Sequence, residues 1–206
     1  MYTLQSRYIT VEGAIGTGKT SLALLLSSKY NGRAILEVVE KNPFLPHFYD
    51  DIKNYAFLTK IFFLLSHYGQ QVKTIRQDLF QQLSFADYMF AKDRIFAHLT
   101  PSGSELAMYE HFYKIVFRDI PVPNLTVYLK ASTGLLMKRI MSRGRSFERN
   151  ISVRYIDRLN GYYEDYFSDQ SNFLQTKLVT VNTDGLDFVG NLHNIRVYLS
   201  KDIGKR

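Results

Sequence analysis

The sequence predicts an α/β fold in which helices cover both faces of a parallel sheet. Two observations support this: apolar β-type segments alternate with longer segments of helical spacing, and a glycine-rich turn joins the first strand to a helix. Strands that alternate with helices pair in parallel, because each connecting helix crosses a face of the sheet. The expected strands lie near residues 7–12, 33–38, 83–86, 125–129 and 178–181.

Apolar spacing and chain breaks place the helices of the first half. A Leu-rich helix over 18–30 follows the first strand, and Asn42-Pro43 breaks the chain before a helix that contains Phe48-Tyr49. A helix from Phe90 to His98 follows the third strand. Between them, a long helix over about 54–75 carries an apolar stripe whose spacing is typical of core packing, formed by Phe57, Ile61, Phe62, Leu64, Leu65 and Tyr68.

Prolines and charges mark the elements of the second half. Residues 105–118 have a helical pattern, and prolines follow where it stops. Further helices are expected at 132–142, 151–167 and 186–200, with a charged loop over 143–150. No repeat or Gly/Ser/Pro-rich linker interrupts the 206 residues, which are 46% hydrophobic, so we expect a single domain over residues 1–206.

The glycine-rich turn has the pattern G-x-x-x-x-G-K-T of a phosphate loop. Its glycines allow positive φ, and its N–H groups and the helix N-terminus would face phosphate oxygens. Lys19 would reach the β- and γ-phosphates, and the Thr20 hydroxyl would bind Mg²⁺. A plain turn with a surface lysine fits the flanking strand and helix less well. The sequence thus predicts an ATP site at Gly13, Ala14, Ile15, Gly16, Thr17, Gly18, Lys19 and Thr20.

Two acidic residues follow expected strands, where a parallel sheet presents side chains to its ligands. Glu37 could accept a proton from a hydroxyl that attacks a γ-phosphate. Asp87 could hold Mg²⁺ through water or support that base. For both, the alternative is an acidic loop residue or a helix cap. Glu40 is expected to be a surface charge.

Five cations gather between Lys138 and Arg149. As a mobile lid, such a segment would neutralise charge on the transferred phosphoryl group and exclude water. The alternative is a solvated basic loop that attracts nucleic acid. Because a phosphate loop occurs in the same chain, we favour the lid, and we attribute the net charge of +7 mainly to phosphate binding.

The composition and the N-terminal sequence also indicate the cellular compartment of the protein. It has no cysteine, which excludes disulfides and thiolate metal sites and fits a reducing compartment. The N-terminus has no signal-peptide pattern, and no apolar run reaches about 18 residues. We therefore expect a cytoplasmic protein without a membrane partner.

Several segments, in this order and spacing, resemble the deoxynucleoside kinase family, which includes bacterial deoxyadenosine/deoxyguanosine kinases and the animal deoxycytidine and deoxyguanosine kinases. The resemblance covers nearly the whole chain. It implies a P-loop nucleotide kinase architecture with an arginine-rich lid near 143–150. The segments are Val11-Glu12-Gly13, Leu36 to Phe44, Phe48-Tyr49-Asp50-Asp51, Phe90 to Ala97, and the lid with Arg143-Gly144-Arg145 and Glu148.

The resemblance also implies roles for individual residues. Glu37 matches the general base, and Tyr49 and Glu148 match the pair that binds the deoxyribose 3′-hydroxyl. Asp93 matches an acid near the nucleobase, and Asp87 matches the acid of the family's Glu/Asp-Arg-Ser motif. The lid arginines correspond to Arg139, Arg143 and Arg145.

The chain departs from the family pattern at three places. Tyr88-Met89 replace the Arg-Ser of the motif, and either Lys92 or Arg94 could supply the missing cation. Lys60 stands where many members have a base-reading glutamine, and His67 where many have arginine; the alternatives are a Lys60 that reaches out of the pocket and a neutral helix residue. The donor's adenine would lie at the turn Asn182-Thr183-Asp184-Gly185.

The activity implied is transfer of phosphate from ATP, with Mg²⁺, to the 5′-hydroxyl of a purine 2′-deoxynucleoside in nucleotide salvage. Deoxyguanosine is slightly favoured over deoxyadenosine, because Lys60 can donate to guanine O6 and N7. One alternative is a thymidylate kinase, which would have little need for a base at Glu37. Another is an ATP-switched regulatory or nucleic-acid-associated protein, which would not need the base, the sugar contacts or the lid. Homodimers are common in the family, so the resemblance implies a homodimer and makes nucleic acid an unlikely partner.

Overall fold

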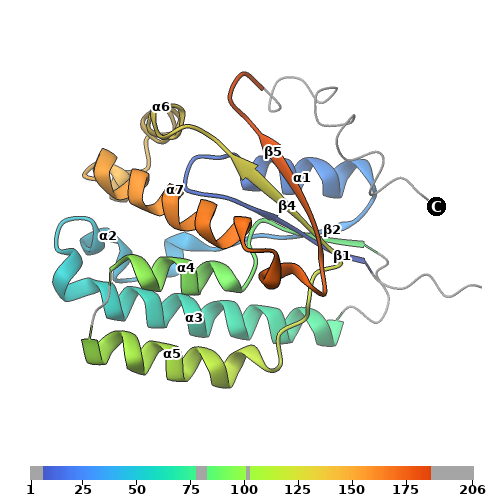
Figure 1. Cartoon of the computed structure of the whole chain (residues 1–206), viewed down its shortest axis with the longest axis horizontal. Helices are drawn as coiled ribbons and strands as arrows, with labels where there is room; N and C mark the ends of the chain where they lie inside the picture. The colour runs from blue at the N-terminus through green and yellow to red at the C-terminus, as the bar shows by residue number, and fades with distance from the viewer. Residues whose placement is uncertain (1–6, 78–82, 101–102, 187–206) are drawn as a thin grey trace, which may run out of the picture.

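The computed structural model describes residues 7–77, 83–100 and 103–186, and its centre is a five-stranded sheet (Figure 1). The strand order is β2-β3-β1-β4-β5, and all four pairings are parallel. This confirms the predicted fold class. The strands are β1 (Arg7–Glu12), β2 (Arg33–Ile35), β3 (Leu83–Ala86), β4 (Leu125–Lys130) and β5 (Lys177–Asn182).

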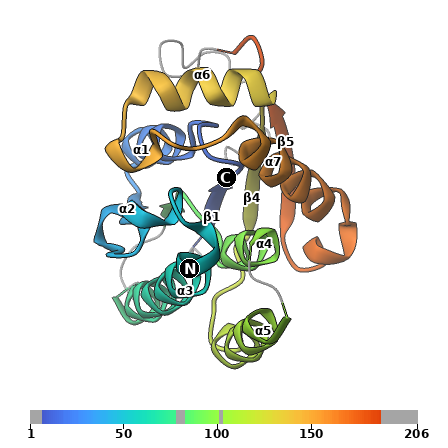
Figure 2. The ribbon, with the colours of Figure 1, turned by 90° about the vertical axis from the view of Figure 1, so that its left-hand side faces the viewer.

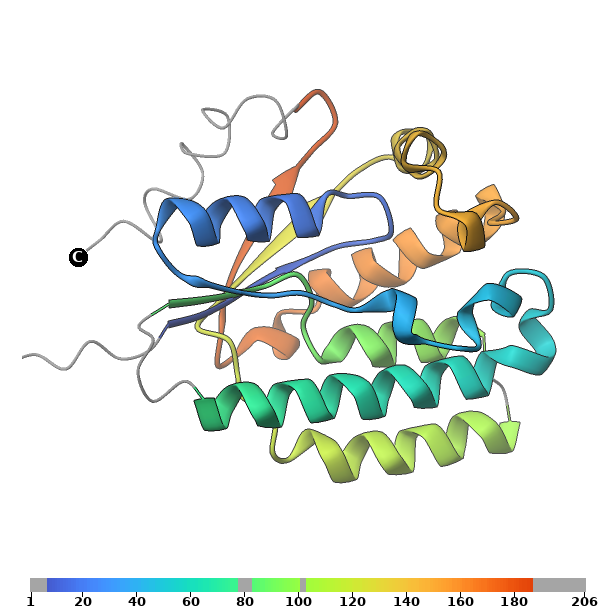
Figure 3. The same cartoon turned by 180° about the vertical axis from the view of Figure 1, so that it is seen from behind.

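Helices lie on both faces of this sheet. Figure 2 shows α1 and α6 on one side of the strands and α3, α4 and α5 on the other, and Figure 3 shows α1 lying across the sheet from behind. The α7 helix packs against both α4 and α6. The helices are α1 (Lys19–Lys29), α2 (Leu45–Phe48), α3 (Ile52–Gln77), α4 (Ala91–Leu99), α5 (Gly103–Phe117), α6 (Thr133–Arg143) and α7 (Val153–Ser168).

The alternation of β1 divides its side chains between the two faces. Ile9 and Val11 pack in the core beneath α1, as the apolar positions of a strand buried on that side should. Thr10 and Glu12 point to the other face, where both are fully buried. The Thr10 hydroxyl shares a hydrogen bond with the Thr126 hydroxyl at 3.0 Å. A buried carboxylate is thereby placed at the carboxyl end of the central strand.

The stripe on α3 is core, as its spacing predicts. Leu64 is fully buried, and Phe57, Ile61 and Tyr68 pack with it against Tyr109 and Tyr113 of α5. Leu65 differs, because 55% of it is exposed. The long helix therefore serves mainly as a platform between the sheet and α5.

The other expected elements differ in their ends, and short 3-10 helices at Val39–Lys41, Ser146–Glu148 and Gln170–Phe173 were not expected. β2 stops at Ile35 instead of 38, because the N–H of Glu37 bonds to the Asp87 side chain and not to a neighbouring strand. α7 begins at Val153, where the Ser152 hydroxyl accepts a hydrogen bond from the Tyr155 N–H. The helix expected at 186–200 lies outside the described residues except for its first position. No helix within the described ranges is both long and apolar enough to cross a membrane.

Candidate active site

The phosphate loop connects β1 to α1 and requires glycine on steric grounds. Gly13 and Gly16 have φ of +154° and +89°. A Cβ on Gly13 would lie 2.5 Å from the Leu129 carbonyl oxygen, and one on Gly16 would lie 3.0 Å from the Leu136 carbonyl oxygen. The loop therefore packs against β4 and α6 with no room for side chains at these positions.

The Lys19 side chain folds back over the phosphate loop that precedes it. Its Nζ donates to the carbonyl oxygens of Gly13, at 2.7 Å, and Ala14, at 3.0 Å. Burial lowers the pKa of Lys19 to about 8, and the nearby charge of Lys92 acts in the same direction. An anion bound at the loop would favour the charged form, so this lysine is suited to phosphate.

Glu12 organises the start of the loop, a role that sequence reasoning missed. Its Oε1 accepts from the Gly13 N–H at 2.9 Å and from the Tyr163 hydroxyl at 3.1 Å, while Oε2 accepts from the Met89 N–H at 2.8 Å. Burial raises the pKa of this carboxyl. The signal in the sequence is an acid in the last position of an otherwise apolar strand, directly before the first glycine.

Asp87 joins the phosphate loop to the segment after β2. Its Oδ2 accepts from the Thr20 hydroxyl at 2.5 Å, and its Oδ1 accepts from the Glu37 N–H at 2.7 Å. A hydroxyl and a carboxylate side by side are hard oxygen ligands, so this pair fits Mg²⁺. The described ranges contain no cluster of three or more His, Cys, Asp or Glu that could hold a metal. A Mg²⁺ ion here would take its remaining ligands from phosphates and water.

Glu37 is held between two cations. Its Oε2 forms an ion pair with Lys92 Nζ, and its Oε1 lies 3.3 Å from His67 Nε2. Burial by itself would raise the pKa of Glu37, but Lys92 and His67 hold it well below its usual range. Arg94, the other cation considered for this role, pairs instead with Glu110 at 2.9 Å, away from the pocket. Lys92 is therefore a site residue that the sequence left undecided.

One pocket brings together most of the residues that the sequence singled out. Aromatic rings from four elements form its walls and could enclose a planar group, those of Phe48, Phe63, Phe96 and Tyr155. The predicted site residues that line it are Ile15, Lys19, Thr20, Glu37, Tyr49, Lys60, Asp87, Asp93, Arg143, Arg145 and Glu148.

Lys60 points into this pocket, so the alternative that it reaches out of it is wrong. Its Nζ lies 4.6 Å from the ring centre of Phe48 and 4.8 Å from that of Phe96, and only 4% of the residue is exposed. Burial lowers the pKa of Lys60 to about 7. The described residues give its Nζ no hydrogen-bond acceptor, so this donor is available to a ligand.

His67 does not line the pocket but lies behind it. Its Nδ1 is 2.9 and 2.8 Å from the two carboxylate oxygens of Asp93, and its Nε2 faces Glu37. Burial would lower the pKa of His67, but Asp93 and Glu37 raise it to about 9. These two carboxylate contacts favour a charged ring over the neutral helix residue that the sequence left open.

The cations of the lid have separate partners. Arg143 Nη2 donates to both carboxylate oxygens of Glu148, at 2.6 and 2.7 Å, and Arg145 lies 3.3 Å from Glu40. Arg139, one turn earlier on α6, does not line the pocket. It donates instead to the Thr183 hydroxyl at 3.1 Å, at the turn expected to hold the donor's adenine.

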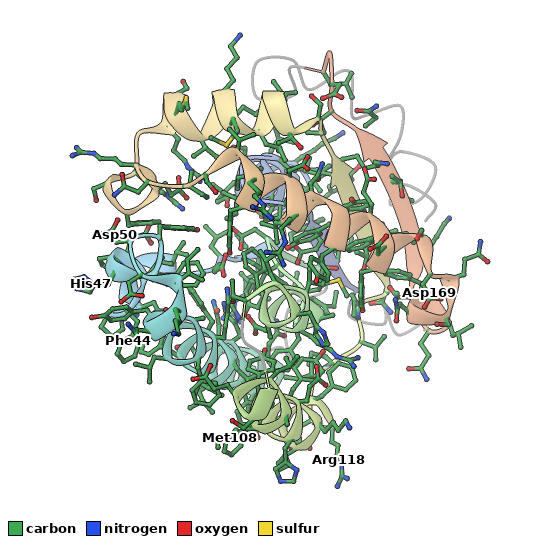
Figure 4. All side chains as sticks on the ribbon, turned by 60° about the vertical axis from the view of Figure 1, so that its left-hand side comes forward. Phe44, His47, Asp50, Met108, Arg118 and Asp169 are labelled. Atoms are coloured by element: carbon green, nitrogen blue, oxygen red, sulfur yellow. The ribbon has the colours of Figure 1, made fainter. Side chains whose placement is uncertain are left out.

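The last residue of the lid is joined to the segment between α2 and α3. Asn150 Nδ2 donates to Asp50 Oδ1 at 2.6 Å. Figure 4 shows Asp50 at the rim of the molecule, beside Phe44 and His47. The lid and the segment between α2 and α3 are thus in contact.

A phosphate loop with its lysine and threonine, a carboxylate facing it from the next strand and an arginine lid define a P-loop phosphotransferase. An aromatic-walled pocket lies beside this loop.

Comparison with known proteins identifies the family. The profile for deoxynucleoside kinases matches residues 9–197, so the chain belongs to the deoxynucleoside kinase family. It is 40% identical over 186 residues to a deoxyguanosine kinase of Bacillus subtilis (strain 168), covering 89% of this chain and 90% of that one. It is 32% identical over 212 residues to a deoxyadenosine kinase of Lactobacillus acidophilus, covering 96% and 95%. The chain is thus a nucleotide-binding transferase that phosphorylates a deoxynucleoside.

Solved structures agree with this assignment. A deoxyadenosine kinase from M. mycoides with bound dCTP superposes with a TM-score of 0.79 at 26% identity. The match covers 94% of this chain and 98% of that one.

Proposed function

We propose that this enzyme transfers the γ-phosphoryl group of ATP to the 5′-hydroxyl of a purine 2′-deoxynucleoside, with deoxyguanosine preferred. Mg²⁺ is the proposed metal, and nucleotide salvage in the cytoplasm is the proposed setting. The observation that carries the proposal is the position of the Glu37 carboxylate, which lies in the proposed acceptor pocket and is linked through Asp87 to the phosphate loop.

Glu37 is proposed as the general base. Its carboxylate takes the proton of the 5′-hydroxyl while that oxygen forms a bond to the γ-phosphorus, and the bond from the γ-phosphorus to the bridging oxygen of ADP breaks. Lys19 neutralises charge on the β- and γ-phosphates. Thr20 and Asp87 would hold Mg²⁺, which supplies charge neutralisation on the phosphates when bound.

The sugar is proposed to lie between Tyr49 and Glu148. Both line the pocket, and Glu148 is 5% exposed and held by Arg143. A hydroxyl donor such as the 3′-OH of deoxyribose would satisfy the free acceptor capacity of this carboxylate. The same contact would bring Arg143 near the transferred group, with Arg145 beside it and Arg139 at the donor's base.

The nucleobase is proposed to meet Lys60 and Asp93 at the aromatic end of the pocket. Guanine offers O6 and N7 as acceptors for the unpartnered Lys60 ammonium, and its N1–H and N2 amino groups as donors for Asp93. Adenine offers Asp93 its amino group but gives Lys60 only ring nitrogens. Relatives named as deoxyguanosine and deoxyadenosine kinases support a purine.

A direct assay tests this proposal. Purified protein is incubated with Mg²⁺-ATP and each of the four deoxynucleosides, and with thymidine monophosphate, and the products are separated by chromatography. We expect deoxyguanosine to be converted to its 5′-monophosphate with the highest kcat/KM. A preference for deoxycytidine or thymidine would contradict the purine assignment, and conversion of thymidine monophosphate would support a thymidylate kinase.

We also propose that residues 1–206 form one domain and that two copies pair. Exposed apolar side chains on α5 support the pairing: Met108, Phe112 and Ile115 recur at helical spacing and are 51, 42 and 52% exposed. Figure 4 shows Met108 at the outer edge of the molecule. Sedimentation velocity of the wild type and of Phe112→Glu would test whether this face joins two chains.

A further inference from the structure

Both ring nitrogens of His67 face carboxylates. Nδ1 lies 2.9 and 2.8 Å from the oxygens of Asp93, and Nε2 lies 3.3 Å from Glu37 Oε1. We propose that His67 is a positioning residue that, as an imidazolium, holds Glu37 and Asp93 as one rigid unit. The inference rests on the proposed function, in which Glu37 is the base and Asp93 reads the nucleobase.

The chemistry of the ring supports the imidazolium form. A neutral imidazole has one N–H, so one of its nitrogens would present a lone pair to a carboxylate. His67 is 3% exposed, and an unmet polar contact at that depth is costly. The protonated ring donates from both nitrogens and meets both carboxylates.

Other charges around the ring leave this assignment intact. Lys92 faces the far oxygen of Glu37, and Lys60 lies near Asp93. Glu12 and Asp87 act on Lys92, and the largest charge effects on His67 come from Asp93 and Glu37. The local field at the ring is therefore set by the two carboxylates that it contacts.

The ring is clamped flat between two aromatic side chains. It stacks on Tyr88 at 4.4 Å and 27°, and on Phe63 at 5.6 Å and 23°. The Tyr88 hydroxyl donates to Gln70 Oε1 at 2.8 Å, and Gln70 Nε2 donates to the Leu36 carbonyl oxygen at 2.9 Å. Leu36 precedes Glu37, so the clamp also fixes the backbone next to the base.

Two departures from the family pattern therefore form one unit. Tyr88 stands in place of an arginine and packs face to face against His67, which also stands in place of one. His67 supplies a cation to the two carboxylates, and Tyr88 supplies the flat surface that holds its ring.

Asp93 keeps acceptor capacity for a ligand in this arrangement. Because Nδ1 is almost equidistant from its two oxygens, the carboxylate is bisected by the ring nitrogen and its outer lone pairs remain open. Loss of the ring charge would take this partner from Asp93 and leave Glu37 held by Lys92 alone. The affinity for the nucleoside and the rate of proton transfer to Glu37 should then fall together.

The test compares His67→Gln, His67→Arg and the control His111→Gln, whose ring is exposed on α5. We expect His67→Gln to raise KM for the nucleoside and to lower kcat, each by about tenfold or more, because a charge-assisted hydrogen bond is lost at both carboxylates. His67→Arg should recover part of both losses, and His111→Gln should change neither. Unchanged kcat and KM in a folded His67→Gln protein, or loss with no recovery in a folded His67→Arg protein, would overturn the proposal.

A measurement on the wild type keeps the proposal testable if the variants do not fold. The ¹⁵N NMR shifts of the His67 ring at neutral pH should show both nitrogens protonated, and a neutral tautomer would overturn the inference. If instead no deoxynucleoside is phosphorylated, or Glu37→Gln retains wild-type turnover, the proposed function fails. The NMR result still decides the charge state of His67 in that case.

Discussion

The backbone N–H of Glu37 donates a hydrogen bond to Oδ1 of Asp87 over 2.7 Å. The second oxygen of the same carboxylate accepts from the Thr20 hydroxyl, at the first turn of α1. One side chain thereby ties the proposed base to the helix that follows the phosphate loop. The sheet fixes the distance between the proposed base and the phosphate loop, because Thr20, Asp87 and Glu37 each follow one of three neighbouring parallel strands.

Replacing Lys19 by alanine should abolish phosphoryl transfer and weaken triphosphate binding. The change removes a cation that faces the β- and γ-phosphates. ATP affinity by calorimetry and turnover with deoxyguanosine measure the two effects. Lys29→Ala, at the exposed end of α1, is the matched control and should behave as wild type. Turnover of Lys19→Ala near the wild-type rate would remove this lysine from the site.

Glu37→Gln should lower kcat by about 10²-fold or more while nucleoside binding persists, because the amide keeps the shape but cannot take the proton. Single-turnover rates and binding titrations separate the two quantities. Glu105→Gln, an exposed glutamate of α5, serves as control. Lost binding with unchanged turnover of bound substrate would make Glu37 a binding residue instead.

Dideoxynucleosides should be poor substrates. Without a 3′-hydroxyl, Tyr49 and Glu148 lose their partner, and we expect kcat/KM to fall by about tenfold or more. The ratio of kcat/KM for the deoxynucleoside to kcat/KM for the dideoxynucleoside should be smaller in Tyr49→Phe than in the wild type. Equal use of both substrates by the wild type would place neither residue at the sugar.

Lys60→Gln should lower the ratio of kcat/KM for deoxyguanosine to that for deoxyadenosine by about tenfold, because a donor to the guanine acceptors is weakened. Asp93→Asn should shift the same ratio. Lys53→Gln, exposed near the start of the same helix, should leave it unchanged. A ratio that neither Lys60→Gln nor Asp93→Asn alters would show that the base binds elsewhere.

Lys92→Met should move the acid limb of the kcat/KM profile to higher pH. Lys92 is the main group that lowers the pKa of Glu37, so removing it raises that pKa. A base acts only when ionised, and activity is lost as pH falls through its pKa. Arg94→Met is the matched control, because Arg94 pairs with Glu110 outside the pocket. Identical acid limbs in wild type and Lys92→Met would argue against Glu37 as the base.

Much of the fold could be predicted from local patterns. The apolar runs at β1 and β3 coincide with the observed strands, and the α3 stripe proved to be core. These elements are predictable because burial of one face places apolar residues at a regular spacing, which can be read from the sequence. The end of β2 could not be predicted, because a single hydrogen bond from Glu37 to Asp87, 50 residues apart, decides where the strand stops.

The site was predictable where a motif fixes the geometry and not where tertiary contacts choose between candidates. The loop glycines and Lys19 fall where the motif requires. Lys92 and Arg94 are two residues apart on α4, and only the packing of that helix decides which of them reaches Glu37. The partners of His67 are distant from it in sequence: Glu37 follows β2, Tyr88 follows β3, and Asp93 lies in α4. The role of His67 can therefore be recognised only in the folded structure.

Within the part of the chain that the structure describes, β2 is an edge strand of three residues whose one partner is β3. Glu37 follows it directly, so the proposed base depends on the least extensive ladder of the sheet, whereas the phosphate loop follows the central strand. Edge segments with few backbone pairings open more readily than central ones. A local opening of this edge would therefore displace the proposed base while the proposed ATP site and the global fold stay in place.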